Sequence, residues 1–305
     1  MNVRRASASL RHLGGRARRL VGRVSTHEEP QGEGRFPIWL EYPVNPKPRY
    51  GYGLPAHPEL DQIIGSGRER YRAHLERFAG LVEHLARIPI AEEGTEPYWF
   101  NGWYQGLDAV SLYCFLVERN PRTYLEIGSG NSTKFARRAI RDHGLRTTIV
   151  SVDPEPRAEI DALCDQVIRK PLEDVDLALI HDLVGPGDIL FLDGSHRCFM
   201  NSDATVAFTE LLPRLADDVL VHVHDIFLPW DYPPTIKDWM YSEHYLLASW
   251  LLAGGRHIEV TLPNFYICLH PDLHGILSPL WDQLLWAATP TNGTGCWLTR
   301  VGGAP

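Results

Sequence analysis

From residue 123 onward, short apolar runs alternate with stretches of helical periodicity, and this alternation constrains the fold more than any other feature. Residues 189–192 form a continuous apolar run, as expected for a strand covered on both faces. Strands separated by helices are typical of βαβ units, so the sequence predicts an α/β fold with a doubly wound sheet. In such sheets ligands bind beyond the carboxyl ends of the strands, where the strand order reverses. The expected strands cover residues 123–127, 147–152, 166–169, 188–192, 218–224, 257–262 and 295–300.

Helices are expected between these strands and also ahead of them. Residues 58–88 place apolar side chains three and four positions apart, which puts them on one helix face. The helical segment 58–88 predicts an N-terminal helical extension, and a second helix is expected over 105–119. An aromatic-rich stretch, 264–288, precedes the last strand. The helices expected within the sheet region cover 132–143, 156–164, 174–183, 201–213 and 237–253.

The charge of the chain is unevenly distributed. Residues 1–27 contain seven arginines and no acidic residue, and we interpret them as a basic, solvated, flexible arm. A transit peptide or a membrane-surface helix would also fit this segment. With seven of the 30 basic residues in the arm, 23 remain against 38 acidic residues. A mostly acidic body does not suit a nucleic-acid-binding protein, which needs a basic face.

Three segments are expected in the chain. The arm, 1–27, is followed by an N-terminal extension or lid, 28–104, and by a cofactor-binding domain, 105–305. The five cysteines include no closely spaced pair, so neither a zinc site nor a disulfide framework is indicated. A reducing cytoplasm is the expected compartment. No apolar run approaches the roughly 20 residues that a membrane span needs. The sequence is also compatible with a homodimer.

The most specific motif is a Gly-x-Gly turn that joins the strand ending at 127 to the following helix. Gly128 permits a tight turn, and Gly130 lets backbone N–H groups approach a ligand. Asn131 or Ser132 would serve as the N-cap of the helix. The third glycine of the dinucleotide motif is replaced by Thr133. This disfavours a pyrophosphate cofactor but leaves room for a smaller anion, such as an amino-acid carboxylate. By itself, Gly-x-Gly is also compatible with a simple strand-to-helix turn.

Polar residues follow two further strands at the same expected edge of the sheet. Asp153 ends the strand after the turn, 25 residues beyond Gly128, where a carboxylate can accept hydrogen bonds from both hydroxyls of a ribose. Asp193, Ser195 and His196 follow the 188–192 strand. Three polar strand ends at one edge predict a binding crevice.

These segments resemble the bacterial class I S-adenosylmethionine-dependent methyltransferases that act on small molecules. The resemblance implies a Rossmann-like sheet of seven strands with the last antiparallel, and S-adenosylmethionine as the cofactor. It places Glu126 near the methionine amino group, Asp153 at the ribose, and the loop Lys170–Asp174 around adenine. The segments that carry the resemblance are Glu126–Ser132, Ser151–Arg157, Asp193–His196 and His224–Tyr232. The candidate cofactor-binding residues are Glu126, Gly128, Ser129, Gly130, Asn131, Ser132, Asp153, Asp193 and Ser195.

The candidate catalytic residues are His196, His224 and Asp225. Methyl transfer from a sulfonium needs an aligned acceptor, exclusion of water and in some cases removal of a proton. Histidine suits the last task because its ordinary pKa is near neutrality. His222 shares a strand face with His224 and is a weaker candidate. Each histidine could instead support a loop through hydrogen bonds.

A metal site is an alternative interpretation of the same strand ends. Related methyltransferases place Mg²⁺ at equivalent positions, with carboxylate or amide ligands. In this sequence His224 stands beside Asp193 and Asp225 at a position where Mg²⁺ would require an oxygen ligand. We therefore expect no catalytic metal.

Eight aromatic residues flank the expected crevice, and large rings can form a dry wall or face a cation. Ordinary packing is the alternative for most of them. They are Trp99, Phe100, Trp103, Tyr104, Trp230, Tyr232, Trp239 and Tyr241.

Three functions fit the sequence. The first is methyl transfer to a hydroxyl, amine or carboxyl group of a small molecule. The second keeps the fold and the cofactor but cyclises the cofactor itself, for example to azetidine-2-carboxylate with release of methylthioadenosine. Asn131 and Ser195 would then bend the aminobutyrate chain. The third is a non-catalytic nucleotide-binding module or an oxidoreductase, and Thr133 disfavours a dinucleotide.

Overall fold

The computed structural model describes residues 41–156, 159–286 and 290–302. The chain divides into two compact units, Met1–Asn45 and Pro46–Pro305. Of the first unit only residues 41–45 are described, and they form no helix or strand. The basic segment 1–27 lies outside the described residues. Residues 46–104 belong to the same compact unit as the sheet.

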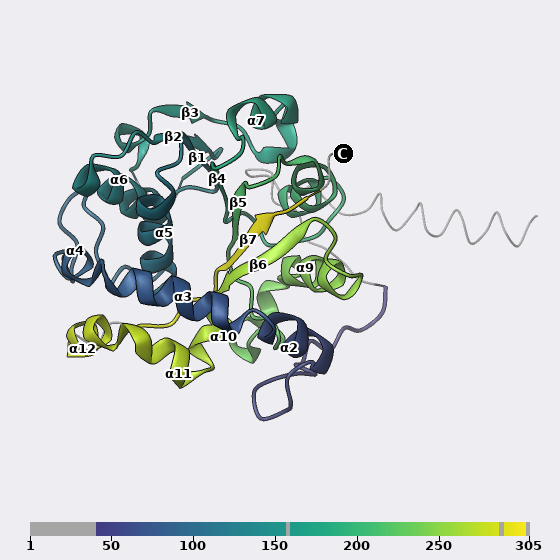
Figure 1. The fold of residues 1–305 in the computed structure, drawn as a ribbon. Helices are drawn as coiled ribbons and strands as arrows, with labels where there is room; N and C mark the ends of the chain where they lie inside the picture. The colour runs from purple at the N-terminus through teal and green to yellow at the C-terminus, as the bar shows by residue number, and fades with distance from the viewer. Residues whose placement is uncertain (1–40, 157–158, 287–289, 303–305) are drawn as a thin grey trace, which may run out of the picture. The chain divides into compact units, whose positions relative to one another are not determined.

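A seven-stranded sheet organises the second unit, with the order β3-β2-β1-β4-β5-β7-β6 (Figure 1). β7 runs antiparallel to β5 and β6, and the remaining neighbours are parallel. The doubly wound sheet of seven strands with an antiparallel last strand is confirmed. The strands are β1 Thr123–Ile127, β2 Thr148–Val152, β3 Gln166–Ile168, β4 Ile189–Leu192, β5 Leu220–Val223, β6 Ile258–Pro263 and β7 Cys296–Arg300.

Three helices replace the single helix expected over 58–88. They are α2 Pro58–Gly65, α3 Arg68–Ala79 and α4 Val82–Leu85. The first break falls at Ser66-Gly67 and the second at Gly80, and glycine is a poor residue in a helix interior. The apolar face is real despite the breaks, because Tyr71, Leu75, Phe78 and Leu85 are buried and Leu81 is partly buried.

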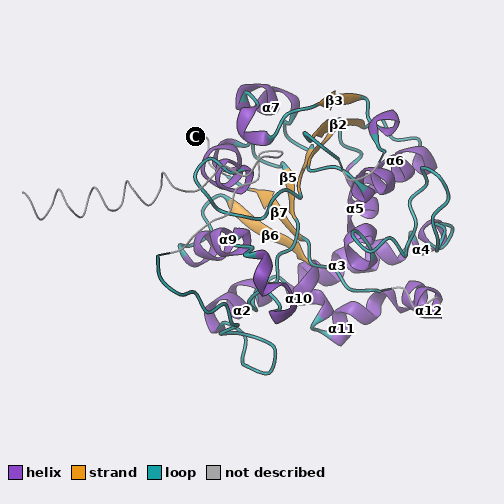
Figure 2. Cartoon of the chain, turned by 180° about the vertical axis from the view of Figure 1, so that it is seen from behind, coloured by secondary structure: helices purple, strands orange, loops and turns teal. Residues whose placement is uncertain are grey.

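Helices cover both sides of the sheet. Figures 1 and 2 show α5 and α6 on one side, and α7 and α9 on the other. α5 is buried over most of its length, as its nearly continuous apolar sequence predicts. The described part of the 264–288 stretch forms short helices. The bounds are α5 Gly106–Arg119, α6 Asn131–His143, α7 Leu177–Leu183, α8 Asp203–Val206, α9 Glu243–Leu252, α10 Asn264–Cys268, α11 Pro271–His274 and α12 Ser278–Trp286.

The helix expected over 156–164 is wrong for the described part of that segment. Only a 3₁₀ turn, η1 Asp161–Leu163, is helical there. Pro154 and Pro156 disfavour helical backbone at the residues before them, and the chain bends at Pro154 and Glu155 after it leaves β2. A second 3₁₀ turn, η2 Leu172–Asp174, precedes α7, whose N-cap is Asp176.

Two longer helices are also interrupted. The segment expected over 201–213 begins as α8 and continues as a π-helical turn, η3 Ala207–Leu211, and a 3₁₀ turn, η4 Leu212–Arg214. The segment expected over 237–253 contains α9, preceded by the 3₁₀ turn η5 Pro234–Trp239. A last 3₁₀ turn, η6 Gly275–Leu277, joins α11 to α12.

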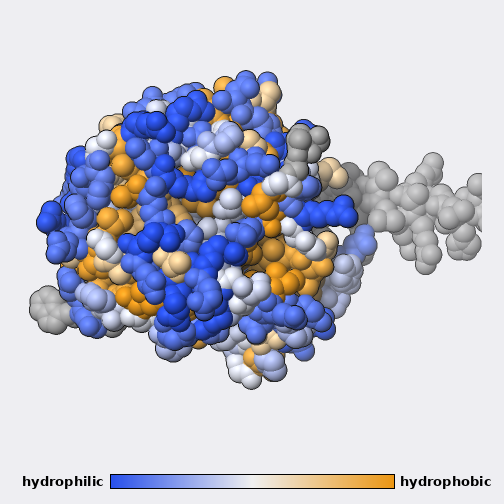
Figure 3. Space-filling model, in the orientation of Figure 1, coloured by the Kyte–Doolittle hydropathy of each residue, from blue (hydrophilic) through white to orange (hydrophobic). Residues whose placement is uncertain are grey.

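The apolar core lies on both faces of the sheet, and β1, β4 and β5 are buried along their whole length. The outer surface in Figure 3 is largely hydrophilic, with hydrophobic side chains visible between the hydrophilic ones. Among the described residues no helix has both the length and the apolar character to cross a membrane.

Candidate active site

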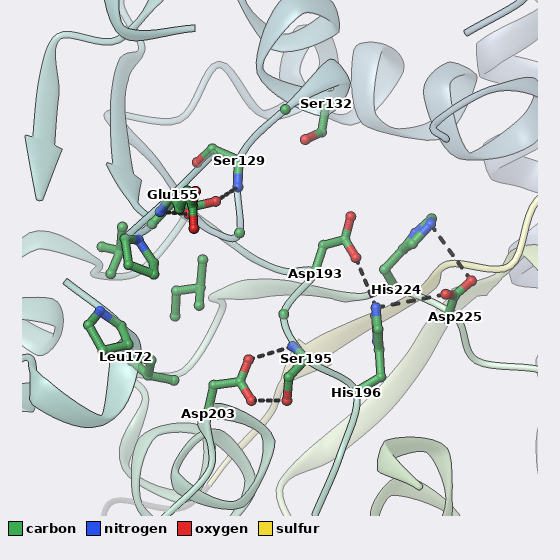
Figure 4. Close-up of a pocket in the computed structure, with 18 of the residues that line it drawn as sticks. Ser129, Ser132, Glu155, Leu172, Asp193, Ser195, His196, Asp203, His224 and Asp225 are labelled. Atoms are coloured by element: carbon green, nitrogen blue, oxygen red, sulfur yellow. Dashed lines mark hydrogen bonds and ion pairs between the residues drawn. The ribbon is translucent and has the colours of Figure 1, made fainter. Parts of the chain in front are cut away.

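A cavity of about 580 Å³ opens at the carboxyl ends of the central strands. Its walls include Gly128 after β1, Asp153 after β2, Asp193 after β4 and His224 after β5, and Figure 4 labels the last two. β1 pairs with β2 on one side and β4 on the other, so the cavity lies where the strand order reverses. The binding crevice expected from the polar strand ends is present, and its volume suits a small molecule.

The glycine turn closes tightly against the neighbouring strand. Gly128 has φ +80°, and a Cβ there would lie 1.8 Å from the carbonyl oxygen of Asp193. Only glycine fits this position. Gly130 is the N-cap of α6, so the N-cap expected at Asn131 or Ser132 is wrong. A Cβ at Gly130 would meet no atom within 4 Å, which leaves the space above the turn open.

Thr133 stands where a dinucleotide motif has its third glycine, and here it supports the turn. Its hydroxyl donates to Glu126 and accepts a hydrogen bond from the Gly130 backbone N–H at 3.2 Å. The hydroxyl of Tyr124 donates to the other Glu126 oxygen at 2.8 Å. Glu126 is fully buried beneath the turn and does not line the cavity. Burial raises its pKa to about 7, although hydrogen bonds from Ser132, Thr133 and Tyr124 oppose the shift.

Asp153 is held by backbone amides. The N–H of Ser129 donates to one carboxylate oxygen at 2.7 Å, and the N–H of Glu155 donates to the other at 2.7 Å. The hydroxyls of Ser129 and Ser151 are 2.8 Å apart beside this contact. Each carboxylate oxygen keeps a lone pair free, so Asp153 can still accept hydrogen bonds from a ligand in the cavity.

The loop after β3 forms the neighbouring wall. Pro171, Leu172 and Glu173 line the cavity, whereas Lys170 and Asp174 do not. Oε2 of Glu173 is buried without a hydrogen-bond partner in the described part of the chain. Burial also raises the pKa of Glu173. An apolar surface with one unpaired polar atom suits a flat heterocycle that carries hydrogen-bond donors.

At the other end of the cavity, three carboxylates surround the imidazole of His196. Nδ1 lies 2.9 Å from Glu243, while Nε2 lies 3.2 Å from Asp193 and 3.7 Å from Asp225. The backbone of His196 has φ +59°, a conformation that non-glycine residues keep only where their surroundings hold it. The imidazole therefore joins the residues that follow β4 and β5, as Figure 4 shows, and its other nitrogen contacts Glu243 at the start of α9.

These contacts make His196 a cation at neutral pH. Burial lowers its pKa, but Asp193 and Glu243 outweigh burial and raise the pKa well above the ordinary histidine value. Burial would raise the pKa of Asp193, yet His224 and His196 hold it well below the usual range. A protonated imidazole cannot accept a proton, which disfavours His196 as the general base.

The same imidazole occupies the space between Asp193 and Asp225, where a bound cation would have to lie. Within the described ranges no group of three or more His, Cys, Asp or Glu residues is arranged to hold a metal ion.

His224 and Asp225 complete this end of the cavity. Nε2 of His224 lies 3.9 Å from Oδ1 of Asp225, and the hydroxyl of Thr294 donates to the same oxygen at 3.0 Å. Burial lowers the pKa of His224, but the carboxylates of Asp193, Asp225 and Asp108 outweigh it and raise the pKa. The ring of Tyr104 packs 5.4 Å from that of His224. His222 lies behind them and does not line the cavity.

Two of the candidate cofactor residues are engaged with the protein itself. The Ser195 hydroxyl and backbone N–H both donate to Asp203. The Asn131 amide donates to Asn101 at 3.4 Å, and Asn101 in turn holds the backbone of Tyr104. Both Ser195 and Asn131 still line the cavity.

Several residues of the site escape sequence analysis. Glu243, Asp203, Asn101 and Thr294 bond to cavity residues from segments 8 to 69 positions away along the chain. None of them belongs to a local motif, so the sequence carries no signal for them. Four of the eight aromatic residues expected to flank the crevice line the cavity: Trp103, Tyr104, Trp239 and Tyr241.

Comparison with known proteins finds a match to a domain family over part of the chain. Residues 125–226 match a family model described as a methyltransferase domain. No curated protein matches the chain. The chain is similar to a solved structure of the plantazolicin methyltransferase BamL in complex with a triazolic desmethylPZN analog and SAH, with 11% identity, 79% of this chain and 99% of that chain covered, and a TM-score of 0.37. That likeness is too distant to bear on the fold or the function of this chain.

Residues 125–226, which match the methyltransferase-domain model, run from within β1 to just after β5 and so form the centre of the seven-stranded sheet. The cavity has features that fit the expected S-adenosylmethionine. Open space lies above Gly130, and Glu173 has an unpaired oxygen in the wall.

Proposed function

We propose that the protein transfers the methyl group of S-adenosylmethionine to a small-molecule acceptor. The observation that carries the proposal is the continuity of one cavity, which runs from Asp153 and the Pro171–Glu173 wall to His224 and Asp225. One end offers the polar groups that a nucleoside needs, and the other offers a carboxylate, an imidazole and aromatic rings.

At the cofactor end, Asp153 would accept hydrogen bonds from the ribose, and the backbone of Gly128–Gly130 would hold the methionine part. Glu173 would receive a hydrogen bond from the adenine side. Glu126 lies beneath the glycine turn and would support it indirectly, through the hydrogen bond that it accepts from Thr133. S-adenosylmethionine supplies an electrophilic methyl group on a positively charged sulfur.

At the acceptor end, we assign to Asp225 the role of accepting the proton that the methyl acceptor loses. Its side chain lines the cavity, and its position is fixed by Thr294. His196 serves as a positioning residue, because its charged ring holds Asp193 and Asp225 side by side. Trp103, Trp239 and Tyr241 would exclude water and pack against the acceptor.

Cyclisation of the cofactor is the weaker alternative. It would use Asn131 and Ser195 to bend the aminobutyrate chain, but these side chains already bond to Asn101 and Asp203. A non-catalytic binding module would not require a carboxylate held in place next to an imidazole at one end of the cavity.

Product analysis tests the proposal. The purified protein is incubated with S-adenosylmethionine and a small-molecule extract, and the nucleoside products are separated by chromatography. Methyl transfer predicts S-adenosylhomocysteine that accumulates only when the extract is present. Methylthioadenosine formed without any extract would instead establish cyclisation or lyase chemistry. Calorimetric titrations with S-adenosylmethionine and with NAD separate both from an oxidoreductase.

A further inference from the structure

His222 is a buried histidine that the proposed reaction does not use directly. Its ring is fully buried, stacked 4.3 Å from that of Phe191 and packed 4.6 Å from that of Trp297. Nε2 of His222 lies 3.3 Å from Nδ1 of His224. Nδ1 of His222 has no hydrogen-bond partner among the described residues. A Cβ at Gly295 would lie 2.1 Å from the His222 ring, so the backbone there closes the remaining space.

These apolar surroundings keep His222 neutral. Burial, and then the charge of His224, lower its pKa well below the ordinary value. A neutral imidazole carries one N–H, which can be on either nitrogen. A proton on Nδ1 would bury an N–H without an acceptor, and orphaned N–H groups are rarer in proteins than orphaned acceptors. A proton on Nε2 instead donates to His224, so this tautomer is favoured whenever His224 is neutral.

The tautomer of His222 determines that of His224. Neutral His224 accepts a hydrogen bond at Nδ1 and therefore carries its own proton on Nε2. Protonated His224 carries protons on both nitrogens. In both states Nε2, the nitrogen on the side of Asp225, is a donor.

We propose that His222 is a positioning residue that fixes His224 as a hydrogen-bond donor, and that His224 and Asp225 together select a hydroxyl group as the methyl acceptor. The second part rests on the proposed methyl transfer. A hydroxyl can accept a hydrogen bond from Nε2 of His224 while it donates to the carboxylate of Asp225. A protonated amine has no lone pair for the first contact.

The charged groups around His224 support the same class of acceptor. Asp193, Asp225 and Asp108 face it, with His196 beyond Asp193. A carboxylate acceptor would place another negative charge among them. In the transfer, a lone pair of the hydroxyl oxygen forms the bond to the methyl carbon, and the electron pair of the broken C–S bond stays on sulfur. The hydroxyl proton passes to Asp225.

The tautomer is measurable without any acceptor. ¹⁵N-histidine-labelled protein with S-adenosylhomocysteine bound is followed by NMR across a pH titration, with His224→Gln to assign the signals. We expect Nε2 of His224 to be protonated at every pH at which the protein is folded. A neutral His224 with its proton on Nδ1 would overturn the proposal.

Two variants test the role of His222 in turnover. His222→Phe keeps a ring but removes the donor, and it should lower kcat/KM for the acceptor about 10–100-fold with an unchanged Kd for S-adenosylmethionine. His222→Gln keeps an N–H donor and should recover most of the loss. If both variants turn over like the native protein, or if glutamine is no better than phenylalanine, His222 does not act through His224.

The acceptor class is tested with [methyl-¹³C]S-adenosylmethionine and a small-molecule extract. The ¹³C chemical shift of the product methyl group distinguishes an ether O–CH₃ from an N–CH₃ or a methyl ester. An ether supports the proposal. An N-methyl or ester product would overturn the acceptor assignment and leave methyl transfer standing, whereas ¹³C found only in methylthioadenosine would refute methyl transfer itself.

Discussion

The two ends of the cavity are built in different ways. At the cofactor end, Asp153 is held by the backbone N–H groups of Ser129 and Glu155, from segments that directly follow β1 and β2. At the acceptor end, His196 is held by side chains that follow β4 and β5 and by one from α9. Backbone contacts depend on the path of the chain, and side-chain contacts depend on which residues the fold brings together. The first end is therefore robust to substitution of its neighbours, and the second is sensitive to each of its members.

The acceptor end should show the largest effect on turnover. Asp225→Asn removes the group that takes the proton, so kcat should fall about 10²–10⁴-fold if proton removal limits the rate. Since Asp225 is remote from the cofactor end, the Kd for S-adenosylmethionine should change less than twofold. Steady-state kinetics and calorimetry measure both quantities.

Asp217→Asn is the matched control, because Asp217 is exposed and does not line the cavity. Native turnover in Asp225→Asn would show that another group takes the proton.

The charged imidazole at the same end should dominate the stability of the site. His196→Ala leaves buried carboxylates without their partner, and breaking such a pair costs about 3–5 kcal/mol. The folded-state pKa of His196 is raised, so its contribution is complete below the ordinary histidine pKa and is lost as the pH rises through the folded-state pKa. The free energy of unfolding should therefore fall on the alkaline side.

Glu243→Gln keeps a hydrogen-bond acceptor for Nδ1 but removes one negative charge, so the loss of stability should move to lower pH. Denaturant unfolding at a series of pH values compares the variant with the native protein. Identical pH profiles would mean that Glu243 does not hold the charge of His196.

Two substitutions in the glycine turn should distinguish an effect on folding stability from an effect on cofactor binding. Gly128→Ala places a Cβ against the Asp193 carbonyl at a positive φ, and should lower the free energy of unfolding by about 2–4 kcal/mol. Gly130→Ala meets no atom within 4 Å, so its stability should change by less than about 1 kcal/mol while cofactor affinity falls. Equal stability of the two variants would contradict the geometry of the turn.

The same difference explains what the sequence could predict. All seven strands were expected within two residues of their observed bounds, because apolar runs between helical stretches are local patterns. Gly128 and Asp153 follow from their spacing after strands, and both line the cavity. The helix expected over 156–164 is wrong, because among its described residues only Asp161–Leu163 is helical.

The acceptor end could not be predicted to the same extent. His196, His224 and Asp225 were identified as polar residues after strands, and the structure does bring them together. Their protonation could not be predicted, because it depends on Glu243, 47 residues away, and on burial. The ordinary pKa of histidine suits a base, but the carboxylates around His196 raise its pKa and keep the ring charged.

Calorimetric titration of S-adenosylmethionine into Asp153→Ala tests the central assignment most directly. We expect binding to weaken by about 1.5–3 kcal/mol, the scale of hydrogen bonds to a charged group. Asp225→Asn, titrated in parallel, should bind the cofactor as the native protein does. Native affinity in Asp153→Ala, or equal losses in both variants, would contradict the division of the cavity into a cofactor end and an acceptor end.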